Sequence, residues 1–152
     1  MKVVHEPTNA ATDISLDQDR YSAFLKEHGA TEKQIALLHI HFTRYCRSDE
    51  FASRVIGGQF LTEKSTYKIS VSLFCIRSSR GVNATLLHET KHFLQRCQGE
   101  SHVEERKKPY YERQYEKDAY KFAADHRDKG FITLHRHVPA WVRLLWTVSM
   151  YL

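Results

Sequence analysis

The chain has 152 residues and a mass of 17.9 kDa, which is the length of one compact domain with its own buried core. Hydrophobic residues make up 41% of it, and eight Phe, eight Tyr and two Trp exclude disorder along the whole length. The formal net charge of +5 favours acidic partners only weakly. The composition therefore gives no clear indication of nucleic-acid binding, which requires the charge to be gathered on one face.

The three cysteines, Cys46, Cys75 and Cys97, are too few and too widely spaced for a disulfide framework or a C-x-x-C zinc pair. We expect them to be buried thiols in a reducing compartment. The opening residues 1–7 lack the apolar stretch of a signal peptide, and no window reaches the length of a membrane span. These features predict a soluble, cytoplasmic protein.

At the N-terminus, residues 1–12 are polar, and we expect them to be flexible. Apolar side chains at helical spacing then predict a first helix from Ser15 to about His28, with Gly29 as its stop. Its buried stripe would be Tyr21, Phe24 and Leu25. A capping box at 31–34 begins a second helix, expected to end before Ser48. Its buried face would be Ile35, Leu38 and Phe42.

The middle of the chain changes its period. Residues 67–76 alternate polar with apolar side chains, which is typical of a half-buried strand. Residues 51–60 could pair with it, with a bend or bulge at Gly57 and Gly58. These segments predict a short antiparallel sheet that follows the N-terminal helices, and residues 77–81 would form a loop.

Helical pattern returns in the second half of the chain. Asn83 is a good N-cap for a helix that lasts to about Cys97, with Gly99 after it. A charged loop, 100–109, separates this helix from another over 110–126, for which Gly130 is the expected stop. Residues 131–138 fit neither the helical nor the strand period. The apolar segment 139–152 predicts a last helix that docks on the core, with a dimer contact or attachment to a membrane surface as alternatives.

The helix over 83–97 contains His88-Glu89-Thr90-Lys91-His92, which matches the pattern H-E-x-x-H. Residues four apart lie on the same helix face, so both imidazoles can reach one cation. Zinc suits two neutral imidazole nitrogens. Glu89 projects further round the helix, where it can take a proton from water beside the ion.

A catalytic zinc site needs a third protein ligand. The extended pattern H-E-x-x-H-x-x-G-x-x-H is excluded, because Gln95 and Gln98 occupy its Gly and His positions. The next helix offers Glu116, which begins an E-x-x-A stretch. The small Ala119 lies one turn later on the same face and would let the two helices approach closely.

Together, His88-Glu89-x-x-His92 and Glu116-x-Asp118-Ala119-x-x-Phe122-Ala123-Ala124 resemble the ImmA/IrrE-type gluzincin metallopeptidases and the minimal gluzincins more broadly. The resemblance covers roughly residues 50–126. It implies His88, His92 and Glu116 as zinc ligands and Glu89 as the general base. It also implies an α+β fold with a small zincin-like domain, in which a strand or hairpin shields the site and the two metal-ligand helices follow. The whole chain, 1–152, would be that single domain.

Other donors remain open from the residues alone. Glu112 lies one turn before Glu116 and could replace it. Further imidazoles are available at His102, His126, His135 and His137. A second donor to the developing oxyanion could come from Tyr110, Tyr111, Tyr115 or a loop histidine.

If the site is real, the expected reaction is hydrolysis of a peptide bond in a protein or peptide substrate, most simply as an endopeptidase. The strand over 67–76 could hold an extended substrate at its edge. Two alternatives stay open: a non-catalytic protein-binding module with structural zinc or none, and another zinc hydrolase such as an amidase. The oligomeric state cannot be read from the sequence.

Overall fold

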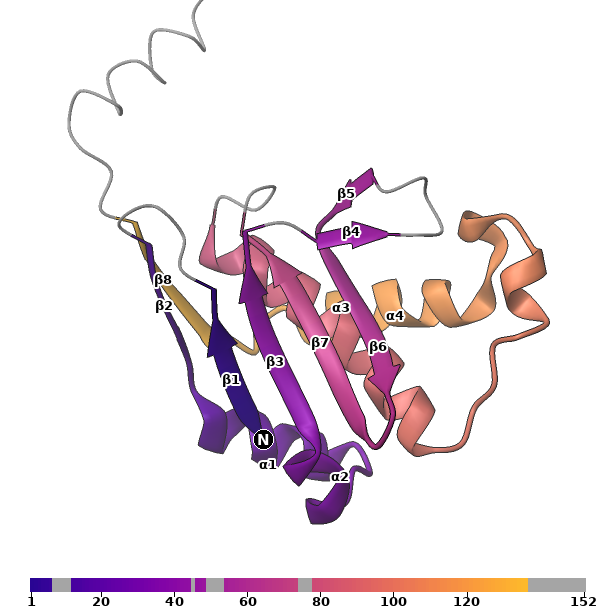
Figure 1. The fold of residues 1–152 in the computed structure, drawn as a ribbon, viewed down its shortest axis with the longest axis horizontal. Helices are drawn as coiled ribbons and strands as arrows, with labels where there is room; N and C mark the ends of the chain where they lie inside the picture. The colour runs from indigo at the N-terminus through magenta and orange to yellow at the C-terminus, as the bar shows by residue number, and fades with distance from the viewer. Residues whose placement is uncertain (7–11, 45, 49–53, 74–77, 137–152) are drawn as a thin grey trace, which may run out of the picture.

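The computed structural model describes residues 1–6, 12–44, 46–48, 54–73 and 78–136 and has a mixed α+β fold (Figure 1). Its main sheet has four strands in the order β1-β3-β7-β6. They span Lys2–His5, Leu38–Thr43, Thr66–Ser72 and Gly58–Glu63 respectively. Two small antiparallel ribbons complete the strands. They pair β2 (Thr12–Leu16) with β8 (Ile132–Arg136), and β4 (Cys46–Ser48) with β5 (Arg54–Ile56).

The main sheet is mixed, so the predicted antiparallel sheet is wrong for most of it. Strand β3 is parallel to both β1 and β7, and only β6 runs antiparallel to its neighbour β7. Parallel neighbours require crossover connections. The chain makes them through α1 and α2 between β1 and β3, and through β4, β5 and β6 between β3 and β7.

At the N-terminus the prediction of a flexible segment fails for residues 2–5, which pair with β3 as strand β1. Helix α1 (Gln18–Glu27) begins later than expected, because residues 15 and 16 pair with β8 and Asp17 caps the helix. Its predicted buried stripe is confirmed. Gly29 follows the helix with φ +96°, a conformation that favours glycine and ends the helix.

The second predicted helix is correct only at its start. The capping box forms at Thr31 and Gln34, but α2 covers only Glu32–Ala36. Residues 38–43 form strand β3 in the middle of the sheet, with alternate side chains fully buried. Leu38 and Phe42 fit the spacing of a helix face as well as that of a strand face. His39 and His41 alternate with the buried Ile40, as in a strand. Because β1 and β7 are available as parallel partners on the two sides, the segment forms a strand.

The predicted strand over 67–76 overlaps β7, and its antiparallel partner is β6, which begins after the bend at Gly57. The predicted partner segment, 51–60, overlaps β6 only at residues 58–60, while residues 54–56 pair with β4 instead. Since β7 lies between β3 and β6, it is not an edge strand. The edge of the sheet next to β7 is β6, and β1 is the opposite edge.

Helix α3 (Ser79–Cys97) crosses one face of the sheet (Figure 1). Ser78 caps it, five residues before the predicted N-cap Asn83. Asn83 instead lies buried inside the helix, where its side chain donates to the carbonyl of Lys129 (2.6 Å) and accepts the amide of Phe131 (3.0 Å). Asn83 therefore fixes the segment that leads into β8.

Two short 3-10 helices, Glu105–Lys107 and Tyr110–Glu112, interrupt the charged segment after α3, and helix α4 follows over Gln114–Asp125. The predicted helix over 110–126 is confirmed for most of its length, although it ends before the expected stop at Gly130. The predicted C-terminal helix, 139–152, lies outside the described residues. Within the described ranges, no helix is both long and apolar enough to cross a membrane.

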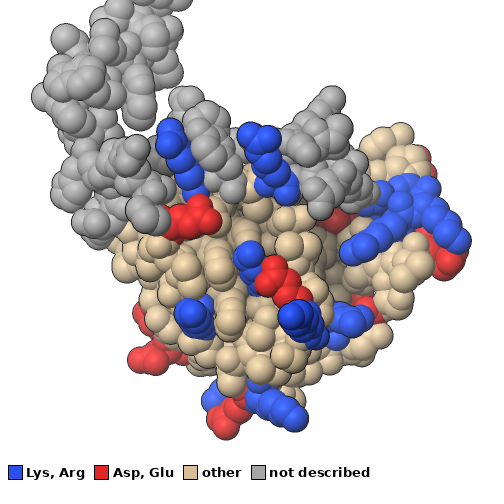
Figure 2. All heavy atoms as spheres, viewed as in Figure 1, with Lys and Arg blue, Asp and Glu red and all other residues tan. Residues whose placement is uncertain are grey.

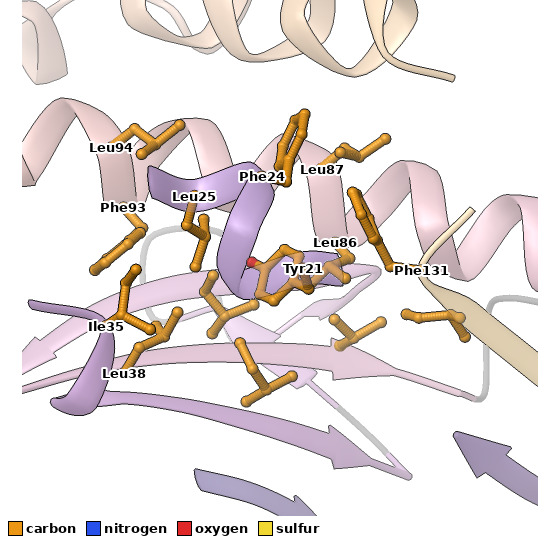
Figure 3. Packing of buried hydrophobic residues seen from close by; sticks show 14 of the residues in the cluster. Tyr21, Phe24, Leu25, Ile35, Leu38, Leu86, Leu87, Phe93, Leu94 and Phe131 are labelled. Carbon is orange, nitrogen blue, oxygen red and sulfur yellow. The ribbon is translucent and has the colours of Figure 1, made fainter. Parts of the chain in front are cut away.

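The hydrophobic core lies between α3 and the sheet, with α1 inserted beside them (Figure 3). Phe131 packs its ring against Tyr21 and Phe24, at centroid distances of 5.3 and 5.0 Å. The apolar face of α3 supplies Leu86, Leu87, Phe93 and Leu94. On the sheet face shown in Figure 2, positive and negative side chains are interspersed, and Lys and Arg are densest beside the connection between α3 and α4.

Candidate metal centre

Helix α3 holds His88 and His92 one turn apart, with both side chains nearly buried. Helix α4 packs against α3, and Ala119 at their contact is fully buried. This close approach, which the small side chain permits, brings Glu116 from the first turn of α4 onto both histidines. The three residues predicted as ligands therefore lie together.

The three side chains converge on one point through single atoms. His88 Nε2 and His92 Nε2 are 3.2 Å apart, and Glu116 Oε2 lies 3.2 Å from the first and 3.4 Å from the second. Tetrahedral zinc with bonds of about 2.05 Å requires its ligand atoms to be about 3.3 Å from one another. Glu116 Oε2 is buried without a hydrogen-bond partner, a need that a cation would meet. This group can therefore hold a metal ion.

Gln95 orients the second histidine, a role that the sequence reasoning missed. Its Oε1 lies 3.1 Å from His92 Nδ1, and the side chain is 1% exposed. An amide oxygen only accepts, so Nδ1 carries the proton and Nε2 keeps its lone pair toward the ligand cluster. In the sequence, Gln95 serves only to exclude the extended pattern H-E-x-x-H-x-x-G-x-x-H. The signal that could have indicated its contact with His92 is its position three residues later on the same helix.

Glu89 lies beside the cluster without joining it. Its carboxylate accepts the backbone amide of Phe60, and its side chain packs against Gly58 in β6. Burial raises the pKa of Glu89, although His92 and His88 oppose the shift. The edge strand thus fixes the position of this carboxylate.

Protonation within the cluster is coupled. Burial alone would raise the pKa of Glu116, but the adjacent imidazoles of His88 and His92, when protonated, and the hydroxyl of Tyr110 hold it well below its usual range. Burial would lower the pKa of His92, but Glu116 and Glu89 raise it instead. The two carboxylates therefore attract positive charge, whether a proton or a metal ion, to the imidazoles.

A cleft of about 1010 Å³ opens over this cluster. One wall is strand β6, including Gly58 and Phe60, and the others are α3, α4 and the segment between them. Tyr110 and Tyr115 line the cleft, so two of the three predicted tyrosine donors remain candidates. Tyr111 is 74% exposed and does not line it.

The rival ligands are not part of the cluster. Glu112 is exposed, and His102 lines the cleft but stacks on the ring of Tyr115 at 4.1 Å. His126 pairs with His28 on a different part of α4. The side chains of His135 and His137 lie outside the part of the chain that the structure describes.

Comparison with protein-family models, with curated proteins and with solved structures finds no match for this chain. The assignment of a function therefore depends on the chemistry of this cleft.

Proposed function

We propose that this chain is a zinc-dependent metallopeptidase with a zincin-like fold, of the ImmA/IrrE-type or minimal gluzincin kind that its motifs resemble. The observation that carries the proposal is the convergence of His88, His92 and Glu116 at distances suited to zinc, with Glu89 beside them at the wall of a cleft. A structural ion would need no cleft and no adjacent carboxylate outside the ligand set.

Zinc bound there would make hydroxide available near neutral pH and polarise a substrate carbonyl. Glu89 is placed to accept the proton of the attacking water and to return it to the leaving amine. The amide of Phe60 and the contact with Gly58 hold that carboxylate in place. The hydroxyl of Tyr110, which contacts Glu116 and lies 3.4 Å from that of Tyr120, can donate to the developing oxyanion.

Strand β6 supports a protein or peptide as the substrate class. It is an edge of the main sheet, and residues 58–62 border the cleft. An extended peptide can bind to such an edge through backbone hydrogen bonds, which would lay its scissile bond along the ligand cluster. We therefore propose an endopeptidase.

The decisive experiment replaces Glu89 with Gln and measures release of fluorescent peptides from labelled casein by the zinc-loaded chain. We expect a loss of rate of about 10²–10⁴-fold, the usual contribution of a general base, with the zinc content unchanged. Glu100→Gln is the matched control, because Glu100 also lines the cleft but is not among the clustered ligands. Wild-type activity in Glu89→Gln would refute the proposed base.

Metal analysis of the purified chain tests the proposal at an earlier step. Purification without chelators should leave about one zinc per chain, and removal of that zinc should abolish hydrolysis. A content below a few tenths of an ion, or a zinc-loaded chain that leaves casein intact, would favour the non-catalytic binding module instead.

A further inference from the structure

A second pair of histidines faces each other away from the cleft. His28 is the C-cap residue of α1 and His126 that of α4, so two helices that are far apart in sequence end side by side. Their Nε2 atoms are 3.2 Å apart, and both side chains are half-buried. Neither residue lines the cleft or belongs to the ligand cluster around Glu116.

The backbone determines which nitrogen of each ring carries the proton. His28 Nδ1 lies 2.9 Å from the carbonyl oxygen of Phe24, and His126 Nδ1 lies 2.9 Å from that of Phe122. A carbonyl oxygen only accepts, so both Nδ1 atoms must be donors. In neutral rings both Nε2 atoms are then bare lone pairs, and at 3.2 Å two lone pairs repel each other. The contact becomes attractive only when a cation lies between them.

We propose that His28 and His126 form a second metal site, for a divalent cation of the zinc class that prefers imidazole nitrogen. Their Nε2 separation equals that of the two histidines in the cleft and suits two ligands of a tetrahedral zinc. A donor Nδ1 bonded to a backbone carbonyl is the usual arrangement behind a metal-bound histidine. Water would complete the coordination, since the pair is only half-buried.

The surroundings favour a cation at this position. Two helix C-termini meet there, and each carries a partial negative charge. The rings of Phe24 and Phe122 pack on both imidazoles at centroid distances of 4.3–5.2 Å and limit their rotation. An ion held by both rings would tie the end of α1 to the end of α4. It would stabilise the helix that supplies Glu116 and take no part in the chemistry of the cleft.

The two sites are separate. Glu116 lies in the first turn of α4 and His126 ten residues later, which is about 15 Å along the helix axis. One ion cannot serve both, so the number of bound ions distinguishes them. The inference does not depend on the proposed enzymatic activity.

The experiment counts zinc in the full chain after equilibrium dialysis at micromolar free zinc and follows thermal unfolding at rising zinc, with Mg²⁺ as the parallel cation. We expect two zinc ions in the wild type and one in each of His28→Gln and His126→Gln. Zinc beyond the first equivalent should raise the unfolding temperature of the wild type and of neither variant, and Mg²⁺ should have no effect. His28→Gln changes the end of α1 and His126→Gln the end of α4. If one variant fails to fold, the other still tests the site.

His39→Gln is the matched control. His39 and His41 also form a pair, but their rings stack at 6.3 Å. This variant should keep both zinc ions. A wild-type zinc content that neither His28→Gln nor His126→Gln lowers, or that His39→Gln lowers as much as they do, would overturn the site; a single zinc that is lost in both variants would instead leave this site standing and contradict the cleft. A pair whose contact is a shared proton would bind no zinc, which also overturns it.

Discussion

Replacement of Gly58 with Ala tests how closely strand β6 lies against helix α3. A Cβ at this position would come within 2.6 Å of Thr85 Cγ2 and within 3.0 Å of both Cγ and Oε1 of Glu89. The neighbouring Gly57 has room, because a Cβ there would meet Thr85 only at 3.8–4.0 Å. The two adjacent glycines therefore form a matched pair.

The cost can be estimated from these contacts. Overpacking of this kind lowers the free energy of unfolding by about 1–3 kcal/mol. Alanine also restricts the unfolded chain more than glycine does, and this raises the free energy of unfolding by about 0.4–1 kcal/mol. Thr85 cannot turn its methyl group away freely, because its hydroxyl donates to the carbonyl of Gly81 at 3.1 Å. We expect Gly58→Ala to lose about 1–2 kcal/mol, or roughly 2–8 °C in Tm, and Gly57→Ala to be neutral or slightly stabilised.

Urea and thermal unfolding of both variants measure the difference. Thr85→Ser in the Gly58→Ala background removes the methyl group of the shortest contact and keeps the hydroxyl, so it should restore part of the lost stability. Glu89 would still be displaced, and hydrolysis should stay low even where stability returns. Equal stability of Gly57→Ala and Gly58→Ala would show that β6 does not press on Glu89 and would refute the placement of the cleft wall.

Three further predictions follow from other contacts. Gln95→Leu removes the acceptor for His92 Nδ1 and should weaken zinc binding by about 10–100-fold in a chelator competition, whereas Gln95→Glu should keep most of the affinity. Thr90 donates to the carbonyl of Leu86, so Tyr21 must donate to Thr90 (2.7 Å). Tyr21→Phe should therefore cost about 1 kcal/mol of unfolding free energy and Thr90→Val more, because the valine leaves a buried hydroxyl without an acceptor; the reverse order would contradict this direction. Burial raises the pKa of the Cys46 thiol to about 11, so its alkylation at pH 8, followed by mass spectrometry, should be on the order of 100-fold slower than that of an unshifted cysteine.

The ligand pattern could be predicted from sequence because most of it depends on one helix. The spacing of His88, Glu89 and His92 determines which atoms share a face once α3 forms. Glu116 required one long-range step, the packing of α4 on α3, and Ala119 was the residue that indicated it. The partner of Glu89, in contrast, is a backbone amide in β6. Every residue has such an amide, so no side-chain pattern marks it.

The errors in the fold have a common physical origin. Residues 2–5 and 38–43 became strands because they pair with each other in parallel, although they lie more than thirty residues apart. Short apolar runs such as Leu38-His39-Ile40-His41-Phe42 fit both a helical and a strand period, and local spacing cannot choose between them. Asn83 was misread for a related reason. It has the side chain of an N-cap, but its hydrogen bonds go to the segment before β8.

The buried polar side chains of α3 and its neighbours differ in whether they have hydrogen-bond partners. Asn83, Thr90 and Gln95 are each paired with a different element of the chain, so their burial is compensated. Among the described residues, the buried side-chain atoms without a hydrogen-bond partner are His88 Nδ1, His102 Nε2 and Glu116 Oε2. All three residues line the same cleft. An unpartnered buried polar atom costs about 1–3 kcal/mol of stability. An ion, water or substrate that partners these atoms would therefore be stabilised in the cleft, where the predicted zinc ligands converge.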